Sequence, residues 1–192
     1  MFDSLANLPT ERRYKGQQFP VPVVVAVLKR LNGKNEPEFL LIKRKQDPFQ
    51  DMWALVGGKW DFGETLTVAV VREVWEETSL ETGLTAVCGI INQRLASGVQ
   101  KQEQGAHFLF FVCELHILNG KAKEQNEGAV AWFSWPEIQQ LQAAEKMIPF
   151  DFVILENWTK TAVSVPVIEA EMSGKMTTNP GSTTELRRFE QV

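Results

Sequence analysis

The sequence contains few of the features that mark disulfide-stapled, zinc-binding or membrane-spanning proteins. Only two cysteines occur, Cys88 and Cys113, and each lies inside an apolar stretch typical of a strand, so we expect both thiols to be buried and reduced. No CxxC pair or cluster of cysteine with histidine indicates zinc. No apolar run approaches the length of a membrane span, and residues 1–16 lack the apolar core of a signal peptide. We therefore expect a cytoplasmic protein without membrane partners.

Positive charge is also in short supply. The formal net charge is −4, so no broad basic surface indicates binding to a nucleic-acid polymer. Hydrophobic residues make up 44% of the chain and charged residues 23%, a balance typical of a globular protein whose 192 residues suit one domain. A mildly acidic protein that handles an anionic phosphate substrate needs positive charge from elsewhere, and a bound divalent cation supplies it.

The apolar pattern predicts a mixed α/β fold. Residues 21–31 are rich in valine, which is typical of a strand buried on both faces. Residues 65–80 form the clearest helix, with Thr65 as a plausible N-cap. Strands dominate the middle of the chain and helices follow, so we expect helices that cover a sheet. Further strands are expected at 38–45, 84–93, 107–118 and 130–135, and further helices at 136–144 and 150–161.

Composition divides the chain into three parts. Residues 1–20 are polar with scattered apolar side chains and are interpreted as a surface arm. Residues 21–165 hold the expected strands and helices and form the single domain. Residues 166–192 form a polar tail, which we expect to be flexible because it buries too little apolar surface to offset the entropy lost on ordering.

Three glutamates on the helix expected at 65–80 carry the chemistry. Glu73, Glu76 and Glu77 stand at positions i, i+3 and i+4, which places three carboxylates on one helix face. Like charges so close repel one another, and a divalent cation removes that penalty. Mg²⁺ prefers oxygen ligands and retains several waters, so a few carboxylates together with substrate phosphate oxygens suit it.

The residues before this helix strengthen that interpretation. Gly57 and Gly58 allow the backbone to approach a ligand or metal closely. Glu64 can pair with Arg72 and fix the loop against the helix. Acidic residues at helical spacing usually form a solvated face, and glycines can serve a tight turn alone. The glycines and the helix glutamates together, at this spacing, are far more specific to a functional site than either feature alone.

The stretch from Gly57 to Leu80 resembles the Nudix box, GX5EX7REUXEEXGU, in which U is a bulky aliphatic residue. One fixed position departs, because Ser79 stands where the family has glycine, and Val56 replaces a proline that often precedes the glycines. The strict motif covers 57–80, and the layout fits about 20–160. The matching positions are Gly58, Glu64, Arg72, Glu73, Val74, Glu76, Glu77 and Leu80.

The resemblance implies an α/β/α sandwich around a mixed β-sheet, and Mg²⁺-dependent hydrolysis of a nucleoside diphosphate linked to another moiety, with Mn²⁺ as a substitute ion. It implies Glu76 and Glu77 as the main metal ligands, Glu73 as a further ligand or the base, and the Gly57 carbonyl as an added ligand. A metal-bound water would attack one phosphorus in line. Coupled carboxylates titrate as a group, so the base is not assigned to one residue.

Other roles follow from the same resemblance. Arg72 and Glu64 would orient the site. Many relatives use one more glutamate from a loop near the late strand, and Glu127 is the first candidate for this metal ligand, with Glu124 second. Residues assigned to substrate binding are Gly57, Gly58, Lys43, Arg44 and Trp53, although strand alternation sends only some of the basic side chains to any one face.

Ser79 leads to a separate expectation. A glycine at a helix end commonly takes a left-handed conformation that serine adopts less readily. The departure at Ser79 therefore predicts that the helix continues past it toward Gly83. The glutamates lie upstream and should be unaffected.

Three functions stay open. A nucleotide pyrophosphohydrolase could act on ADP-ribose, a nucleotide sugar, a dinucleotide cofactor or an oxidised nucleoside triphosphate. Arg94 stands where some ADP-ribose-specific relatives carry proline, and Tyr14 is the sole tyrosine, which weakens a diadenosine-polyphosphate assignment. The alternatives are a non-catalytic nucleotide-binding or regulatory module and a structural protein with an acidic helix. Relatives are often dimers, so a homodimer is also open.

Overall fold

A computed structural model describes residues 20–46, 49–95, 106–158, 164–165, 167–173 and 185–191. The expected strands and helices are present with ends near those predicted, and two short strands at 53–54 and 56–59 were not predicted. No helix in these ranges is long and apolar enough to cross a membrane. The elements are β1 (Val21–Leu31), β2 (Pro37–Arg44), β3 (Trp53–Ala54), β4 (Val56–Lys59), α1 (Leu66–Thr78), β5 (Glu81–Leu95), β6 (Ala106–Asn119), β7 (Gly128–Ser134), α2 (Trp135–Ala143), α3 (Pro149–Trp158), β8 (Ile168–Ser173) and β9 (Glu185–Gln191).

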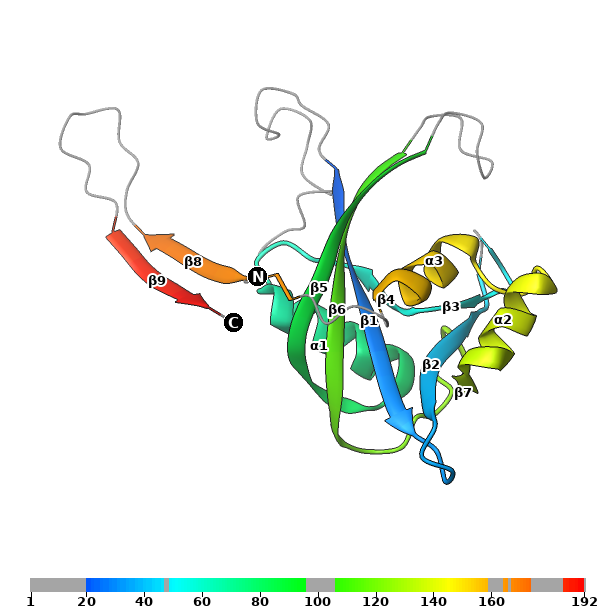
Figure 1. Ribbon diagram of the computed structural model, residues 1–192. Coiled ribbons are helices and arrows are strands. Elements are labelled where there is room, and N and C mark those ends of the chain that lie inside the picture. The colour runs from blue at the N-terminus through cyan, green and yellow to red at the C-terminus, as the bar shows by residue number, and fades with distance from the viewer. Residues whose placement is uncertain are drawn as a thin grey trace.

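Strand β1 is the centre of a mixed seven-stranded sheet. It pairs in parallel with β6 and antiparallel with β2 and β4. Strand β5 pairs with β6 at one side, whereas β3 and β7 both pair with β2 at the other. Helix α1 packs on one face, and α2 with α3 lie on the other (Figure 1). The expected α/β/α sandwich is confirmed.

The valine-rich strand β1 divides the core in two. Val24, Ala26 and Leu28 are buried with the inner face of α1, whereas Val25 and Val27 are buried with residues of α2 and α3. Successive side chains of a strand point to opposite faces, so a continuous apolar run is required where helices cover both faces. The expectation of burial on both faces is therefore confirmed, and it explains why β1 holds the sheet between the two helical layers.

Helix α1 begins where the sequence predicted. The Thr65 hydroxyl accepts a hydrogen bond from the Val68 backbone N–H at 3.2 Å, which satisfies one of the free donors of the first turn. The inner face is buried, but Val68 and Trp75 on the outer face are 52% and 58% exposed. Helix α1 therefore forms an outer layer, with apolar side chains exposed on its outer face. The buried inner residues are Leu66, Ala69, Val70, Val74, Glu77 and Thr78.

The expected continuation of α1 past Ser79 is wrong. The helix ends at Thr78, and Ser79 adopts the left-handed conformation with φ 60° and ψ 19°. Strand β5 begins two residues later, so Gly83 lies inside a strand rather than beyond a helix end. A serine thus occupies the conformation that glycine adopts most readily.

Contacts from other parts of the chain account for this helix end. The Ser79 N–H closes the last turn on the Trp75 carbonyl at 2.8 Å. The side-chain amide of Gln125 donates to the Ser79 hydroxyl, and the Lys123 N–H donates to the Thr78 carbonyl at 2.9 Å. These bonds satisfy groups that an uncapped helix end leaves free, so they offset the cost of the left-handed serine.

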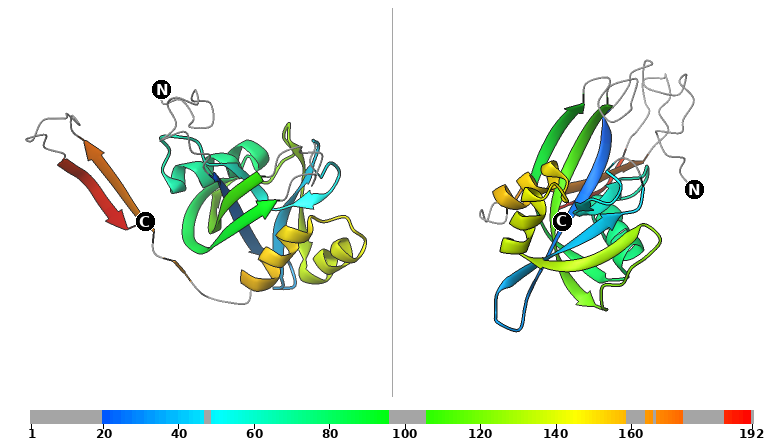
Figure 2. Two further views of the ribbon diagram at one scale, coloured as in Figure 1. Left: turned by 90° about the horizontal axis from the view of Figure 1, so that it is seen from above. Right: turned by 90° about the vertical axis from the view of Figure 1, so that its right-hand side faces the viewer.

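The C-terminal segment contains paired strands, and its expected flexibility stays a prediction. Strands β8 and β9 pair antiparallel as a separate two-stranded sheet, which lies to one side of the main sheet (Figure 1; Figure 2). Shortly before β8, the Val165 N–H donates to the Val87 carbonyl at 2.7 Å, so the chain returns to the outer edge of β5. The tail therefore contains paired strands, whereas the predicted arm at 1–20 lies outside the described residues except for Pro20.

A buried carboxylate joins α3 to the strand that leads to α1. Asp151 is 9% exposed, and it accepts a hydrogen bond from the Leu55 N–H at 2.8 Å. Burial raises the pKa of Asp151 from 3.8 to about 7, although the Leu55 N–H and the charge of Arg44 both lower it. Between these two pH values the folded state binds more protons than the unfolded state, so stability falls as pH rises.

We expect the substitution Asp151→Asn to flatten this pH dependence. Asparagine retains an acceptor for the Leu55 N–H but does not titrate. The free energy of unfolding, which in wild type falls by up to about 4 kcal/mol between pH 4 and pH 7, should therefore change less in the variant. Urea unfolding at pH 5 and pH 8 measures this change. As a control, Asp151→Ala removes the acceptor and should cost about 1–3 kcal/mol at both pH values. If the free energy of unfolding changed equally with pH in wild type and Asp151→Asn, Asp151 would not be the source of the pH dependence.

Candidate active site

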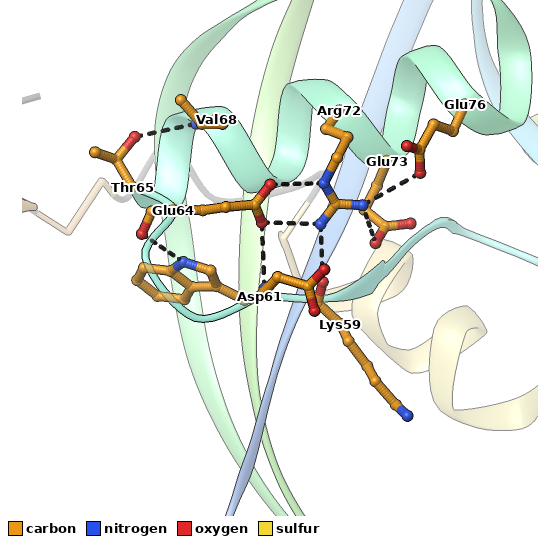
Figure 3. A network of polar contacts seen from close by, with 9 residues as sticks. Lys59, Asp61, Glu64, Thr65, Val68, Arg72, Glu73 and Glu76 are labelled. Atoms are coloured by element: carbon orange, nitrogen blue, oxygen red, sulfur yellow. Dashed lines mark hydrogen bonds and ion pairs between the residues drawn. The ribbon is translucent and has the colours of Figure 1, made fainter. Parts of the chain in front are cut away.

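The guanidinium of Arg72 on α1 joins the loop before the helix to the glutamates on the helix. Its Nε and Nη2 donate to the two carboxylate oxygens of Glu64 at 2.7 and 2.9 Å (Figure 3). Nη2 also donates to the Lys59 carbonyl at 3.1 Å. A two-pronged pair of this kind fixes both partners in orientation. The Glu64–Arg72 pairing expected from the sequence is therefore confirmed.

The third nitrogen of the Arg72 guanidinium, Nη1, lies among the carboxylates of α1. Nη1 donates to Glu73 at 2.8 Å and to Glu76 at 3.2 Å (Figure 3). The side chain of Glu73 is 13% exposed and that of Glu76 is 48% exposed. Burial raises the pKa of Glu73, and the hydrogen bond from Arg72 opposes this shift. Arg72 thus supplies the positive charge that keeps these carboxylates together.

Other residues support Glu64 from the loop side. The Trp60 indole N–H donates to the Glu64 carbonyl at 3.0 Å, and the Asp61 N–H donates to its carboxylate at 3.2 Å. The hydrogen bond from Arg72 lowers the pKa of Glu64. Sequence reasoning did not assign these roles to Trp60, Asp61 and Lys59, and their position inside the loop was the only available signal.

Glu77 lies deepest in the group. It is 6% exposed, and its carboxylate accepts a hydrogen bond from the Gly57 N–H at 3.0 Å. Gly57 has φ 150°, and a Cβ at this position would collide with the Val24 carbonyl of β1. Glycine is therefore required where β4 runs close to β1 and presents its N–H to the helix.

Gly58 serves a neighbouring contact. A Cβ on Gly58 would collide with the carboxylate of Glu73. The two glycines thus allow the backbone of β4 to lie directly against the carboxylates of α1. The sequence predicted a close approach of this backbone to a ligand or metal, and that approach stays a prediction.

The structure brings Glu127 to the same place from the loop between β6 and β7. Burial, together with a side-chain hydrogen bond and charge repulsion from Glu127, raises the pKa of Glu77 to about 9. Repulsion from Glu127 also contributes to the raised pKa of Glu73. Glu124, the second candidate, instead forms an ion pair with Lys45 at 2.9 Å. The structure therefore favours Glu127 over Glu124 as the glutamate facing α1.

The donor set of this site fits a divalent cation. Within the part of the chain that the structure describes, no three acidic, histidine or cysteine side chains converge in a ligating arrangement, because Arg72 holds Glu73 and Glu76 while Glu77 bonds to Gly57. Every candidate donor is nevertheless an oxygen, as Mg²⁺ prefers. Burial and the neighbouring Glu127 and Glu73 all disfavour the charged form of Glu77, and a cation bound beside it would favour that form.

The predicted substrate residues on β2 and β3 fall in two places. Lys43 and Trp53 lie on the opposite side of the sheet from α1, where they line a cavity with Met52, Leu141 and Lys146. Arg44 follows on the other face of the strand, and its backbone pairs with Gly128, next to Glu127. The structure therefore places the backbone of Arg44 beside the residue that follows Glu127, whereas Lys43 and Trp53 lie on the side of the sheet away from α1. Their role in substrate binding stays a prediction.

The cysteines and histidines of strands β5 and β6 lie outside the candidate site. Cys88 and Cys113 are free and buried, as expected. His107 hydrogen-bonds to Asn92, and His116 hydrogen-bonds to Thr85. These contacts give both histidines structural roles on the sheet.

Curated proteins of known name resemble the chain. An ADP-ribose pyrophosphatase of Methanocaldococcus jannaschii is 31% identical over 122 residues, which are 64% of this chain and 66% of that protein. A putative 8-oxo-dGTP diphosphatase of Bacillus subtilis is 43% identical over 53 residues, 28% of this chain and 34% of that protein. The chain thus spans less than two thirds of the length of each relative.

Solved structures share the fold. A NUDIX hydrolase from Nitrosomonas europaea has a TM-score of 0.61 at 23% identity, covering 74% of this chain and 90% of that chain. The NUDIX domain of Shewanella oneidensis NrtR, solved with ADP ribose, has a TM-score of 0.60 at 19% identity, covering 81% and 94%. The family model for the NUDIX domain matches residues 20–157. With the box residues gathered at the turn between β4 and α1, this match shows that the chain belongs to the Nudix hydrolase family.

Proposed function

We propose that this protein hydrolyses a pyrophosphate bond in a nucleoside diphosphate linked to another moiety, in a reaction that depends on Mg²⁺. The observation that carries the proposal is that Glu127 of the β6–β7 loop interacts with both Glu73 and Glu77 of α1, whose carboxylates lie against the Gly57–Gly58 turn. So many carboxylates in and around a buried position destabilise the fold unless a cation or proton joins them. In a metal-dependent hydrolase, these carboxylates would bind the cation that the reaction requires.

Glu73, Glu76, Glu77 and Glu127 would hold the ion, and the Gly57 carbonyl would add a further oxygen. When bound, Mg²⁺ neutralises phosphate charge and activates water for attack on phosphorus. The carboxylates of the chain would take up the proton of the attacking water. Their titrations are coupled, so this role belongs to the group rather than to one residue.

Arg72 and Glu64 would act through orientation. Because Glu64 and the Lys59 carbonyl bind two sides of the guanidinium, Arg72 holds a defined position above Glu73 and Glu76. The carboxylates then lose fewer conformations when a ligand orders them, which preserves binding free energy. Glu64 thus contributes without contact to substrate.

Names of relatives guide the choice of substrate. Similarity to an ADP-ribose pyrophosphatase makes ADP-ribose the first compound to test, and similarity to a putative 8-oxo-dGTP diphosphatase makes an oxidised nucleoside triphosphate the second. The mildly acidic chain, with net charge −4, favours a small nucleotide over a nucleic-acid polymer. A non-catalytic nucleotide-binding module is the alternative, and it would bind these compounds without turnover.

We expect Glu77→Gln to lower kcat with ADP-ribose by two or more orders of magnitude, because the deepest carboxylate loses its charge. Phosphate-containing products measured with and without Mg²⁺ give the rate. Glu81→Gln is the matched control, since Glu81 is exposed at the start of β5, and its rate should equal wild type. Similar turnover by wild type and Glu77→Gln would refute the mechanism, and binding without turnover by wild type would favour the alternative.

Mg²⁺ should also stabilise the fold without substrate. A ligand that binds only the folded state at 100 times its Kd adds about 2.7 kcal/mol to the free energy of unfolding. We expect a rise in Tm for wild type and a smaller rise for Glu77→Gln, measured by thermal unfolding across a Mg²⁺ series with Ca²⁺-free buffer. A wild-type Tm that does not respond to Mg²⁺ would argue for a structural acidic helix instead.

A further inference from the structure

Ser79 departs from the family motif, and its side chain makes a contact that glycine cannot make. The Ser79 hydroxyl accepts a hydrogen bond from the side-chain amide of Gln125. Gln125 lies in the β6–β7 loop, residues 120–127, two positions before Glu127. The contact therefore joins the end of α1, two residues after Glu77, to the loop that carries the fourth carboxylate.

The rest of the loop is held mainly through backbone atoms. The Lys123 N–H donates to the Thr78 carbonyl at 2.9 Å, and the Lys45 N–H donates to the Glu127 carbonyl at 3.1 Å. The Lys45 ammonium also donates to the Gln125 carbonyl at 3.2 Å. These bonds, with the Lys45–Glu124 ion pair, connect the loop to α1 and β2. The Gln125–Ser79 bond adds a side-chain contact between the loop and the end of α1.

We propose that Ser79 is a positioning residue, whose hydroxyl holds Gln125 and thereby aims Glu127 at Glu77 on the catalytic helix. This inference rests on the proposed function of the glutamates. Glu127 is exposed, and its charge repels Glu73 and Glu77 when they are ionised. Once Glu77 loses the proton of its hydrogen bond with Glu127, this repulsion favours outward movement of the loop. A tie beside Glu77 opposes that movement and keeps Glu127 available to a cation.

Serine suits this position because it combines two properties. It tolerates the left-handed conformation when neighbouring contacts hold it, and it provides an acceptor close to the backbone. The Ser79 carbonyl lies close to Gly120, where an added Cβ would stand 3.1 Å away, so the loop and helix end are packed together. A glycine at 79 would fit the backbone equally well but would leave the Gln125 amide without this partner.

The test compares Ser79→Gly with Ser79→Asn. Both residues accept the left-handed conformation, but only asparagine supplies a side-chain oxygen to Gln125. Two readouts need no turnover: amide hydrogen exchange across residues 120–128 of the full-length protein, and the Kd for Mg²⁺ by calorimetric titration. The third readout separates kcat for ADP-ribose from the Mg²⁺ concentration at half-maximal rate.

We expect Ser79→Gly to speed exchange in the loop and to weaken Mg²⁺ binding, each by about three- to tenfold, the range for one lost hydrogen bond. Ser79→Asn should stay near wild type in both. Gln125→Met removes the donor and should reproduce Ser79→Gly without adding to it. In a Glu127→Gln background, Ser79→Gly should no longer change Mg²⁺ affinity, because the carboxylate that it positions is gone.

Equal loop exchange and equal Mg²⁺ affinity in Ser79→Gly and wild type would overturn the proposal. A full additional loss of Mg²⁺ affinity in the Glu127→Gln background would also overturn it, because Ser79 would then act on the ion by another route. Failure of the proposed function looks different, since wild type itself would neither bind Mg²⁺ nor hydrolyse substrate. A difference in loop exchange between Ser79→Gly and Ser79→Asn would still support the tie to Gln125.

Discussion

The candidate site depends on one guanidinium that binds three carboxylates. Arg72 is anchored by both oxygens of Glu64 and reaches Glu73 and Glu76 with its remaining nitrogen. Without it, the glutamates at the turn between β4 and α1 would repel one another at partly buried positions, where repulsion is costly. The ion pairs at Glu64 and Glu73 are largely shielded, so they are screened less by salt than pairs on the open surface.

Arg72 leaves Glu77 unneutralised, and this imbalance points to function. Glu77 is buried against Gly57 with Glu127 beside it, an arrangement that costs stability in the ion-free protein. Gly57 has no room for a side chain beside the β1 backbone, and a side chain at Gly58 would displace the Glu73 carboxylate. Residues that satisfy function at the expense of stability are typical of active sites. Burial of β1 on both faces stabilises the fold and offsets the free-energy cost of burying Glu77.

Spatial proximity in this site comes from elements far apart in the chain. Strand β4 brings the glycines, α1 brings three glutamates, and the β6–β7 loop brings Glu127. The end of α1 is where these elements meet, and Ser79, Lys123 and Gln125 join them there. The same meeting explains why a serine can end the helix in a left-handed conformation, since its neighbours satisfy the groups that the helix leaves free.

Local patterns in the sequence determined the elements and half of the site. The 3.6-residue period placed Glu73, Glu76 and Glu77 together on α1, the valine run of β1 required cover on both faces, and charge predicted the Glu64–Arg72 pair, because each depends on neighbours a few residues away. Tertiary structure decided what depends on distant partners. The left-handed Ser79, the approach of Glu127 to Glu77, and the separation of Trp53 from α1 follow from contacts that span more than twenty residues. No local period encodes such contacts, since packing and long-range hydrogen bonds can override a residue's own preference.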